Sequence, residues 1–391
     1  MSERDANPNV EDVARASFAI VANGFAEGPA QALRDHLVGL GADVVTVFHP
    51  LTREQGTAHL VSRYTTGHVV QRRSINVPLR PPLSFAADPL VPLRLPRVDA
   101  WFGFNPLACA RGLAARRLGR ARKVVLWSVD YVPNRFGPRS PLTHLYNSLD
   151  RLACIRADGR VELSEAAQLA RDRQHGLTGD GPTTLVVPMG AWLGRTPTVQ
   201  VDGFARRNVV FLGHLVPRQG VATLLDALAI LDARGEKVVA DVIGTGPDEP
   251  MLRARVRALG LESTVRLHGF VADHREVERI LAASSIGIAP YEPSKTTFTR
   301  HADPGKLKAY LAAGLPIILT DVPPNARELA RDAGAVIVRY DPLAIADAIA
   351  DGLASTERWG QRRADALRYA RGFDWAVLLP DALARLGLEP G

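Results

Sequence analysis

The sequence predicts an α/β fold with two domains that face each other across a cleft. The chain has 391 residues, and single hydrophobic cores rarely grow beyond roughly 250–300 residues. Short β-rich runs alternate with segments of helical period in both halves, a pattern typical of parallel sheets covered by helices on both faces. Residues 194–207 show no apolar period and are expected to link the two halves.

The expected domain boundaries follow from this linker. We expect a first domain over residues 1–195, a second over residues 208–350, and C-terminal helices over residues 351–391, at least one of which packs on the first domain. In open α/β sheets, ligands bind outside the carboxyl ends of the strands. Two such edges would face each other, so the binding site is expected in the cleft.

The second half has the clearer alternation. Its helices show apolar residues at helical spacing, and glycines such as Gly235, Gly260 and Gly314 follow their ends. The expected strands are Val209–Gly213, Val238–Gly244, Val265–Leu267, Ile286–Pro290, Ile317–Thr320 and Ala335–Val338. The expected helices are Val221–Arg234, Asp248–Leu259, Asp273–Ala283, Pro304–Ala313 and Asn325–Ala333.

The first half repeats the alternation with looser spacing. Residues 78–96 contain six prolines and little periodicity, which indicates a long surface loop. The expected strands are Ser17–Ala22, Asp43–Phe48, Asp99–Phe104 and Lys123–Trp127. The expected helices are Gln31–Leu40, Leu107–Leu118 and Leu142–Arg156, followed after Asp341 by Gln361–Ala370 and Ala376–Leu386.

Charge and cysteine content limit the partners. The net charge of +7 favours an anionic partner, namely a nucleotide, a phosphate, an acidic lipid or a nucleic acid, without choosing among them. Cys109 and Cys154 lie in apolar helical segments, which indicates reduced, buried thiols in a cytoplasmic protein. The polar, acidic N-terminus does not resemble a secretory signal. No run reaches the roughly 18 apolar residues of a spanning helix, so any membrane contact is expected to be peripheral.

Two segments of the second half are expected to begin helices whose first N–H groups could bind an anion. Gly244 and Gly246 follow a strand and open a helix, which fits an anion-binding turn or an ordinary tight turn. Glu249 replaces the third glycine of the dinucleotide fingerprint, which disfavours a nicotinamide oxidoreductase. Further on, Asp303 is expected to cap the helix that Pro304 begins.

Gly305 and Lys306 complete this second helix start. Their free N–H groups and the lysine charge would favour an anion, although an ordinary capped helix has the same pattern.

The ordered set of these segments resembles the donor domain of glycosyltransferase family 4, which has the GT-B fold. The resemblance implies two Rossmann-like domains and retaining transfer of a sugar from a nucleoside diphosphate to an acceptor hydroxyl, with neither a metal nor another cofactor. The segments that resemble the family are Val210–Gly213 with Gln219–Gly220, Ile243–Pro247, Val265–Val271, Ile286–Tyr291 and Pro304–Pro316 and, in the first half, Ala157–Glu165 and Val187–Gly190.

The resemblance also implies a donor site. The residues that match it are Gly213, His214, Arg218, Gly244, Gly246, Tyr291, Asp303, Gly305 and Lys306. At the two positions where the family has an arginine and a lysine that bind the diphosphate, this chain has His214 and Gln219, with Arg218 adjacent to Gln219. Where the family has two glutamates, it has His301 and Ala309.

We therefore expect Lys306 and Arg218 to hold the diphosphate between residues 213–220 and the start of the Pro304 helix. His214 would add a hydrogen bond, and Asp303 would cap the helix or bind a sugar hydroxyl.

In the first half, Asp130 and Asn105 follow expected strands and are the candidate catalytic residues. The family often has a His-Asp pair here, of which Asp130 alone is present. The resemblance implies that the protein contributes positioning and charge stabilisation rather than a general base. A carboxylate that caps its own loop is the alternative for Asp130.

The segment Arg111–Lys123 mixes basic and apolar residues. It predicts either a solvated helix face or a peripheral contact with an anionic membrane at its inner face, as a lipid-linked acceptor would require. A glycan or a small molecule is the alternative acceptor, and no nucleic-acid-binding module is recognised. A sugar-nucleotide epimerase or phosphorylase, or a non-catalytic binding protein, remains an alternative on the same fold.

Overall fold

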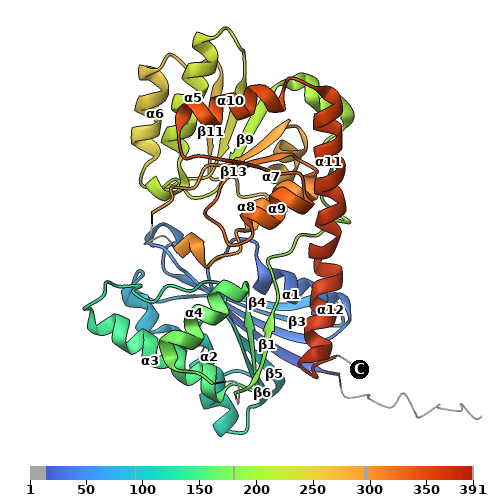
Figure 1. Cartoon of the computed structure of the whole chain (residues 1–391). Coiled ribbons are helices and arrows are strands. Elements are labelled where there is room, and N and C mark those ends of the chain that lie inside the picture. The colour runs from blue at the N-terminus through green and yellow to red at the C-terminus, as the bar shows by residue number, and fades with distance from the viewer. Residues whose placement is uncertain (1–14, 93, 179–180, 295–297, 390–391) are drawn as a thin grey trace, which may run out of the picture.

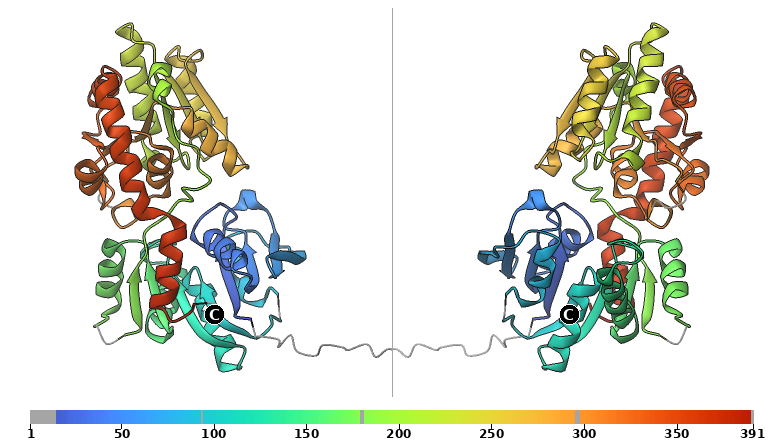
Figure 2. Two further views of the ribbon diagram at one scale, coloured as in Figure 1. Left: turned by 90° about the vertical axis from the view of Figure 1, so that its right-hand side faces the viewer. Right: turned by 90° about the vertical axis from the view of Figure 1, so that its left-hand side faces the viewer.

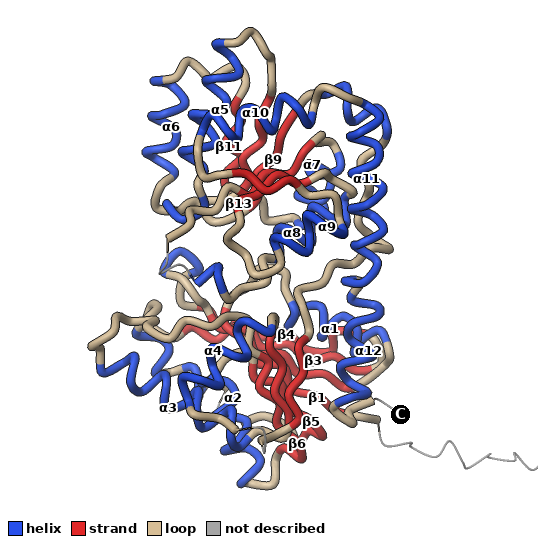
Figure 3. Tube along the Cα trace, in the orientation of Figure 1, coloured by secondary structure: helices blue, strands red, loops and turns tan. Residues whose placement is uncertain are grey.

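The computed structural model describes residues 15–389 except 93, 179–180 and 295–297. The first fourteen residues, which predict no secretory signal, therefore lie outside the described residues. The chain forms two α/β domains stacked one above the other, and its C-terminal helices run along one side of both (Figures 1 and 2). Each sheet lies between layers of helices (Figure 3), which confirms the predicted fold class.

The first sheet has eight strands within the described residues, in the order β4-β3-β2-β1-β5-β6-β7-β8. Adjacent residues of β1 face opposite cores, with Phe18 and Ile20 in one and Ala19 and Val21 in the other, as expected for a strand buried on both faces. The strands are β1 (Ser17–Asn23), β2 (Asp43–His49), β3 (Ala58–Thr65), β4 (His68–Asn76), β5 (Val98–Gly103), β6 (Ala121–Trp127), β7 (Gly159–Glu162) and β8 (Thr183–Val186).

This sheet is not wholly parallel, which corrects the sequence expectation. β3 runs antiparallel to β2, and β4 runs antiparallel to β3, with Thr66 and Gly67 in the turn between them. Both turn residues have positive φ angles, 50° and 80°. Because β4 is an edge strand and mostly exposed, its sequence lacks the apolar run by which the buried strands were recognised.

The helices of the first domain cover both faces of its sheet, and short 3-10 turns occupy the proline-rich loop. The α-helices are α1 (Pro29–Gly39), α2 (Pro106–Arg117), α3 (Pro141–Arg156) and α4 (Glu165–His175). The 3-10 turns are η1 (Arg53–Gln55), η2 (Leu83–Ala86) and η3 (Asp88–Leu90).

The second sheet has six parallel strands within the described residues, in the order β11-β10-β9-β12-β13-β14. Its strands are β9 (Asn208–Leu212), β10 (Val239–Ile243), β11 (Val265–Gly269), β12 (Ile286–Ala289), β13 (Ile317–Thr320) and β14 (Val336–Val338). Its helices are α5 (Val221–Ala233), α6 (Glu249–Ala258), α7 (His274–Ala282), α8 (Gly305–Ala313), α9 (Ala326–Asp332), α10 (Pro342–Gly352) and α11 (Thr356–Ala370), with 3-10 turns η4 (Val201–Arg206), η5 (Pro217–Gln219), η6 (Phe298–Arg300) and η7 (Arg371–Phe373).

The last helix, α12 (Trp375–Arg385), returns to the first domain, as predicted. Trp375, Leu379 and Leu383 are buried in the core of the first sheet together with residues of β1 and α1. A backbone bridge between Ala191 and Asp374 fixes where the chain crosses. Among the described residues, no helix is both long and apolar enough to cross a membrane.

The packing of α12 predicts the effect of removing one side chain. Leu379→Ala should lower the free energy of unfolding by about 2–5 kcal/mol, because the leucine is fully buried and its loss leaves a cavity. Denaturant unfolding of the full chain measures this change. Val377→Ala on the exposed face of α12 is the control and should change stability by less than about 0.5 kcal/mol. Equal effects of the two changes would contradict the packing of α12 on the first core.

Candidate functional site

A cavity of about 390 Å³ lies between the two domains. Its walls come from the segments that follow β1, β9 and β12, from the start of α8, from the chain between β8 and β9, and from α12. The carboxyl edges of both sheets therefore contribute to one site, as the cleft prediction requires. The lining residues used below are Glu27, Arg195, Gly213, Gln219, His274, Glu278, Tyr291, Gly305, Lys306 and Ala309.

Lys306 is the cation at the centre of this site. Its Nζ donates to Gln219 Oε1 at 2.5 Å and lies 3.9 Å from the centre of the Phe211 ring and 4.9 Å from that of Tyr291. Among the described residues, no carboxylate lies within ion-pair distance of it. Burial lowers the pKa of Lys306 well below its usual value, because the desolvated ammonium has no opposite charge. An anion entering the cavity would supply that charge.

Tyr291 is another residue of the cavity lining, and its hydroxyl has almost no accessible surface. It is buried and has no hydrogen-bond partner among the described residues. Buried polar atoms are rarely left without a partner.

Gly213 gives Lys306 the space it occupies. Its φ angle is 147°, and a Cβ atom here would lie 2.9 Å from Lys306 Nζ. Gly244 and Gly246 have a different role, since a Cβ atom on them would lie 1.9 Å from the backbone oxygen of Gly213 and 2.2 Å from that of Leu215, respectively. These two glycines allow two loops to stack and do not line the cavity, which fits the tight-turn alternative.

Asp303 does not cap α8, so this prediction is wrong. The helix begins at Gly305 with Pro304 in the cap position, which leaves Asp303 one residue too early to reach the free N–H groups. Its buried carboxylate instead accepts hydrogen bonds from Met189 N at 2.7 Å and Asn325 Nδ2 at 2.9 Å. Lys308 Nζ lies 3.3 Å from it. Asp303 therefore ties the first domain to the start of α8 from behind the cavity.

Two other candidate donor residues also lie outside the cavity lining. His214 is exposed, and the Arg218 backbone oxygen accepts a hydrogen bond from Glu292 N at 3.0 Å. Burial lowers the pKa of the Arg218 guanidinium. Of the nine predicted donor residues, the cavity lining brings together Gly213, Tyr291, Gly305 and Lys306.

The two candidate catalytic residues are engaged elsewhere. The Asp130 carboxylate pairs with Arg135 of its own loop at 2.5 Å and is not among the cavity-lining residues. Asn105 caps α2 by accepting from Ala108 N at 2.9 Å and donates to Asn23 at 2.8 Å. These contacts hold both side chains in place in this structure, and a catalytic role for either stays a prediction.

The cavity contains a group of charged residues that the sequence did not reveal. Arg195 lies between two carboxylates, 3.9 Å from Glu27 and 3.5 Å from Glu278, and His274 lies 3.5 Å from Glu278. Two features of the sequence could have indicated these residues. Glu27 follows a strand and directly precedes the Gly-Pro pair that begins a helix. His274 and Glu278 are four residues apart, so they share one face of a helix. Arg195 had no signal, because it lies in the aperiodic linker.

The basic segment Arg111–Lys123 is largely occupied by internal contacts. Arg111 donates to the backbone oxygen of Val91 at 2.7 Å, and Lys123 donates to that of Leu386 at 3.2 Å. Arg116 pairs with Asp158. Membrane contact through this segment stays a prediction, with fewer free charges than the sequence suggests.

The comparisons with known proteins agree with this architecture. Residues 206–355 match the family model of glycosyl transferases group 1. The chain is similar in structure to sucrose-phosphate synthase from Thermosynechococcus elongatus, with a TM-score of 0.69 at 14% identity over 94% of this chain and 97% of that one. These findings show the GT-B fold. No match emerges from a sequence search of curated proteins.

Two further structures have the same fold. The Anabaena protein HepE, in complex with UDP-glucose, matches with a TM-score of 0.66 at 19% identity over 95% of this chain and 99% of its own. The pneumococcal O-GlcNAc transferase GtfA, in complex with UDP and GlcNAc, matches with a TM-score of 0.64 at 12% identity over 96% and 99%.

The contact between Lys306 and Gln219 predicts how the cavity binds anions. Gln219→Glu keeps the shape of the side chain but places a carboxylate against Lys306, so it should weaken the binding of inorganic pyrophosphate at least about tenfold, or 1.4 kcal/mol. Isothermal titration calorimetry measures the affinity. Gln200→Glu, at an exposed position, is the matched control and should bind as the unaltered chain does. Unchanged affinity in Gln219→Glu would mean that anions bind elsewhere.

Proposed function

We propose that the protein is a retaining glycosyltransferase of the family 4 type, which transfers a sugar from a nucleoside diphosphate to an acceptor hydroxyl. The observation that carries the proposal is the Lys306 side chain, which is partly buried, lacks a carboxylate partner among the described residues and lines the interdomain cavity of a GT-B fold. A leaving diphosphate develops negative charge, and a preorganised cation in a desolvated site stabilises such charge strongly.

The diphosphate lies between residues 213–220 and the start of α8 in this proposal. The first N–H groups of α8 and its positive dipole end add to the charge of Lys306. The ring of Tyr291 lies beside the ammonium position on the same wall, with its centre 4.9 Å from Lys306 Nζ. In this proposal the step uses neither a metal nor another cofactor, and Lys306 and the start of α8 offset the charge of the leaving group.

The acceptor enters from the first domain. Glu27 of the first domain, Arg195 of the linker and Glu278 of α7 in the second domain provide carboxylates and a guanidinium in the cavity, groups that hydrogen-bond well to the hydroxyls of a glycan or of a small polar molecule. A lipid-linked acceptor would require the peripheral membrane contact discussed above. UDP-glucose, which HepE binds, is the first donor to test.

Binding measurements test the donor site. Lys306→Ala should weaken the binding of UDP about 10- to 100-fold and leave that of uridine nearly unchanged, since a hydrogen bond to a charged group contributes about 1.5–3 kcal/mol. Lys237→Ala, an exposed lysine of the same domain, removes the same charge and should have no effect. A double variant that combines Lys306→Gln with Gln219→Lys should recover UDP binding, because it returns a cation to the same contact. Equal losses for UDP and uridine would remove Lys306 from the phosphate site.

Turnover measurements test the reaction itself. The chain should release nucleoside diphosphate from a matching nucleotide sugar only when an acceptor is present, and NMR of the product should show the anomeric configuration of the donor. Turnover of the donor without an acceptor would indicate an epimerase or a hydrolase. Tight binding of donors with no turnover across a panel of acceptors would indicate a binding protein.

A further inference from the structure

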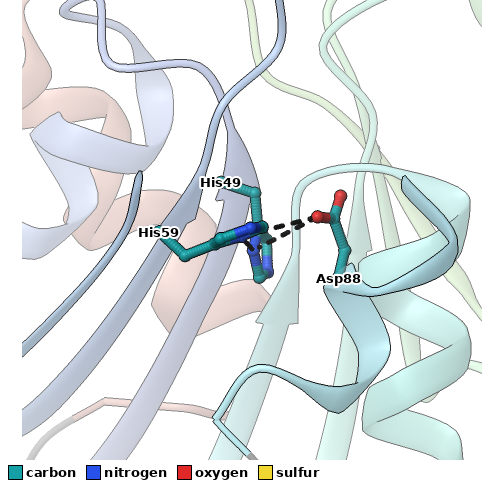
Figure 4. Close-up of side chains that lie close together, drawn as sticks. All are labelled: His49, His59 and Asp88. Carbon is teal, nitrogen blue, oxygen red and sulfur yellow. Dashed lines mark hydrogen bonds and ion pairs between the residues drawn. The ribbon is translucent and has the colours of Figure 1, made fainter. Parts of the chain in front are cut away.

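Three buried polar side chains converge in the first domain, outside the cavity described above (Figure 4). His49 ends β2, His59 lies on β3, and Asp88 begins η3 in the proline-rich loop. Their exposed fractions are 1%, 0% and 3%. The two Nδ1 atoms lie 2.7 Å apart, and Asp88 Oδ1 lies 3.5 Å from that of His49 and 3.6 Å from that of His59.

The strand register brings the two histidines together. β2 and β3 are antiparallel with Phe48 opposite Leu60, so His49 and His59 are the next opposite pair and their side chains share one face of the sheet. On the other side of His49, the parallel register places Asn23 of β1 beside it. Three neighbouring strands therefore present polar side chains at one edge, where the loop carrying Asp88 covers them.

A second layer of contacts holds Asp88 in place. Asn23 Nδ2 donates to Asp88 Oδ2 at 2.7 Å, and Asn105 Nδ2 donates to Asn23 Oδ1 at 2.8 Å. Arg111 binds the backbone of the same loop at Val91 O. This chain of contacts leaves the other oxygen of Asp88 pointing at the two histidines, as second-layer hydrogen bonds orient the ligands of metal sites.

Hydrogen bonding within the cluster is incomplete. The hydrogen bond between the two Nδ1 atoms requires one of them to donate and the other to accept. A hydrogen shared between the two Nδ1 atoms leaves no donor for Asp88 Oδ1. This oxygen and His59 Nε2 are buried without a hydrogen-bond partner among the described residues. A carboxylate oxygen in that position is costly unless something positive binds it.

We propose that His49, His59 and Asp88 bind a divalent transition metal of the Zn²⁺ type. Zinc binds imidazole nitrogen and carboxylate oxygen at about 2.0–2.2 Å, so tetrahedral ligand atoms lie roughly 3.3 Å apart. The two separations to Asp88 already fit this value, and the two Nδ1 atoms need to separate by roughly 0.6 Å. Three protein ligands leave one coordination position for a water molecule.

The role of this metal is structural. It fastens the loop of residues 77–97 to the edge of the sheet, a loop with no strand or α-helix of its own in the described residues. Asn23, which orients Asp88, also begins the segment that carries Glu27 and Gly28 into the cavity. The metal therefore supports one wall of the cavity without lining it.

Metal analysis of the full chain tests the proposal. The protein, expressed in medium with added Zn²⁺ and purified without chelator, should contain one equivalent of zinc, and its thermal unfolding midpoint should fall after chelation and recover with Zn²⁺. Expression with Co²⁺ should give the visible absorption of a four-coordinate nitrogen and oxygen site. A strong near-ultraviolet thiolate band would instead place the metal at Cys109 or Cys154 and overturn the proposal.

Substitutions identify the ligands. Asp88→Asn and His59→Gln should abolish stoichiometric metal, and Asn23→Ala should weaken binding about 10- to 100-fold through the second layer. His68→Gln removes an exposed imidazole from β4 and should bind as the unaltered chain does. If a ligand variant does not fold, zinc content and the cobalt spectrum of the unaltered chain still decide the question. A zinc-free unaltered chain, or folded ligand variants that retain full zinc, would refute the site.

Discussion

The buried carboxylate of Asp303 is the interaction on which the geometry of the cavity depends. It accepts a hydrogen bond from Met189 in the chain that leaves the first domain and contacts Asn325 and Lys308 of the second. Removing one partner of a buried pair leaves an uncompensated charge, so the arrangement is stable only when all partners are present. Because Lys306 follows three residues later, this contact also fixes the cation relative to the first domain.

The contact between Lys306 and Gln219 bears on the proposed phosphate site, because this chain departs there from the family pattern that it resembles. The lysine that the family has before the second glycine is Gln219 here, and Lys306 reaches the side chain of that glutamine from α8. In the proposed donor site, the start of α8 would therefore supply the charge that the family pattern has in the loop. Gly213 is part of the same arrangement, since a side chain there would displace the ammonium.

The sequence predicted the fold better than the site, for physical reasons. The buried parallel strands β9, β10 and β12 are nearly continuous apolar runs, which a pattern of hydrophobicity detects. The exposed edge strand β4 has no such run and was missed. Local motifs pointed to Gly213 and Lys306, which both line the cavity. The helix cap predicted at Asp303 was wrong by one residue. No local pattern pointed to Arg195.

The cluster of His49, His59 and Asp88 shows the limit of local patterns most clearly. The two histidines are ten residues apart, and they meet only because the antiparallel register pairs them. The expectation that no metal is bound came from the family resemblance. Asn105, predicted as catalytic from its place at a strand end, contacts Asn23, which in turn contacts Asp88. The rule that functional residues follow the carboxyl ends of parallel strands thus located polar residues at that edge of the first sheet. In the proposed metal site, some of these residues hold the cavity wall in place.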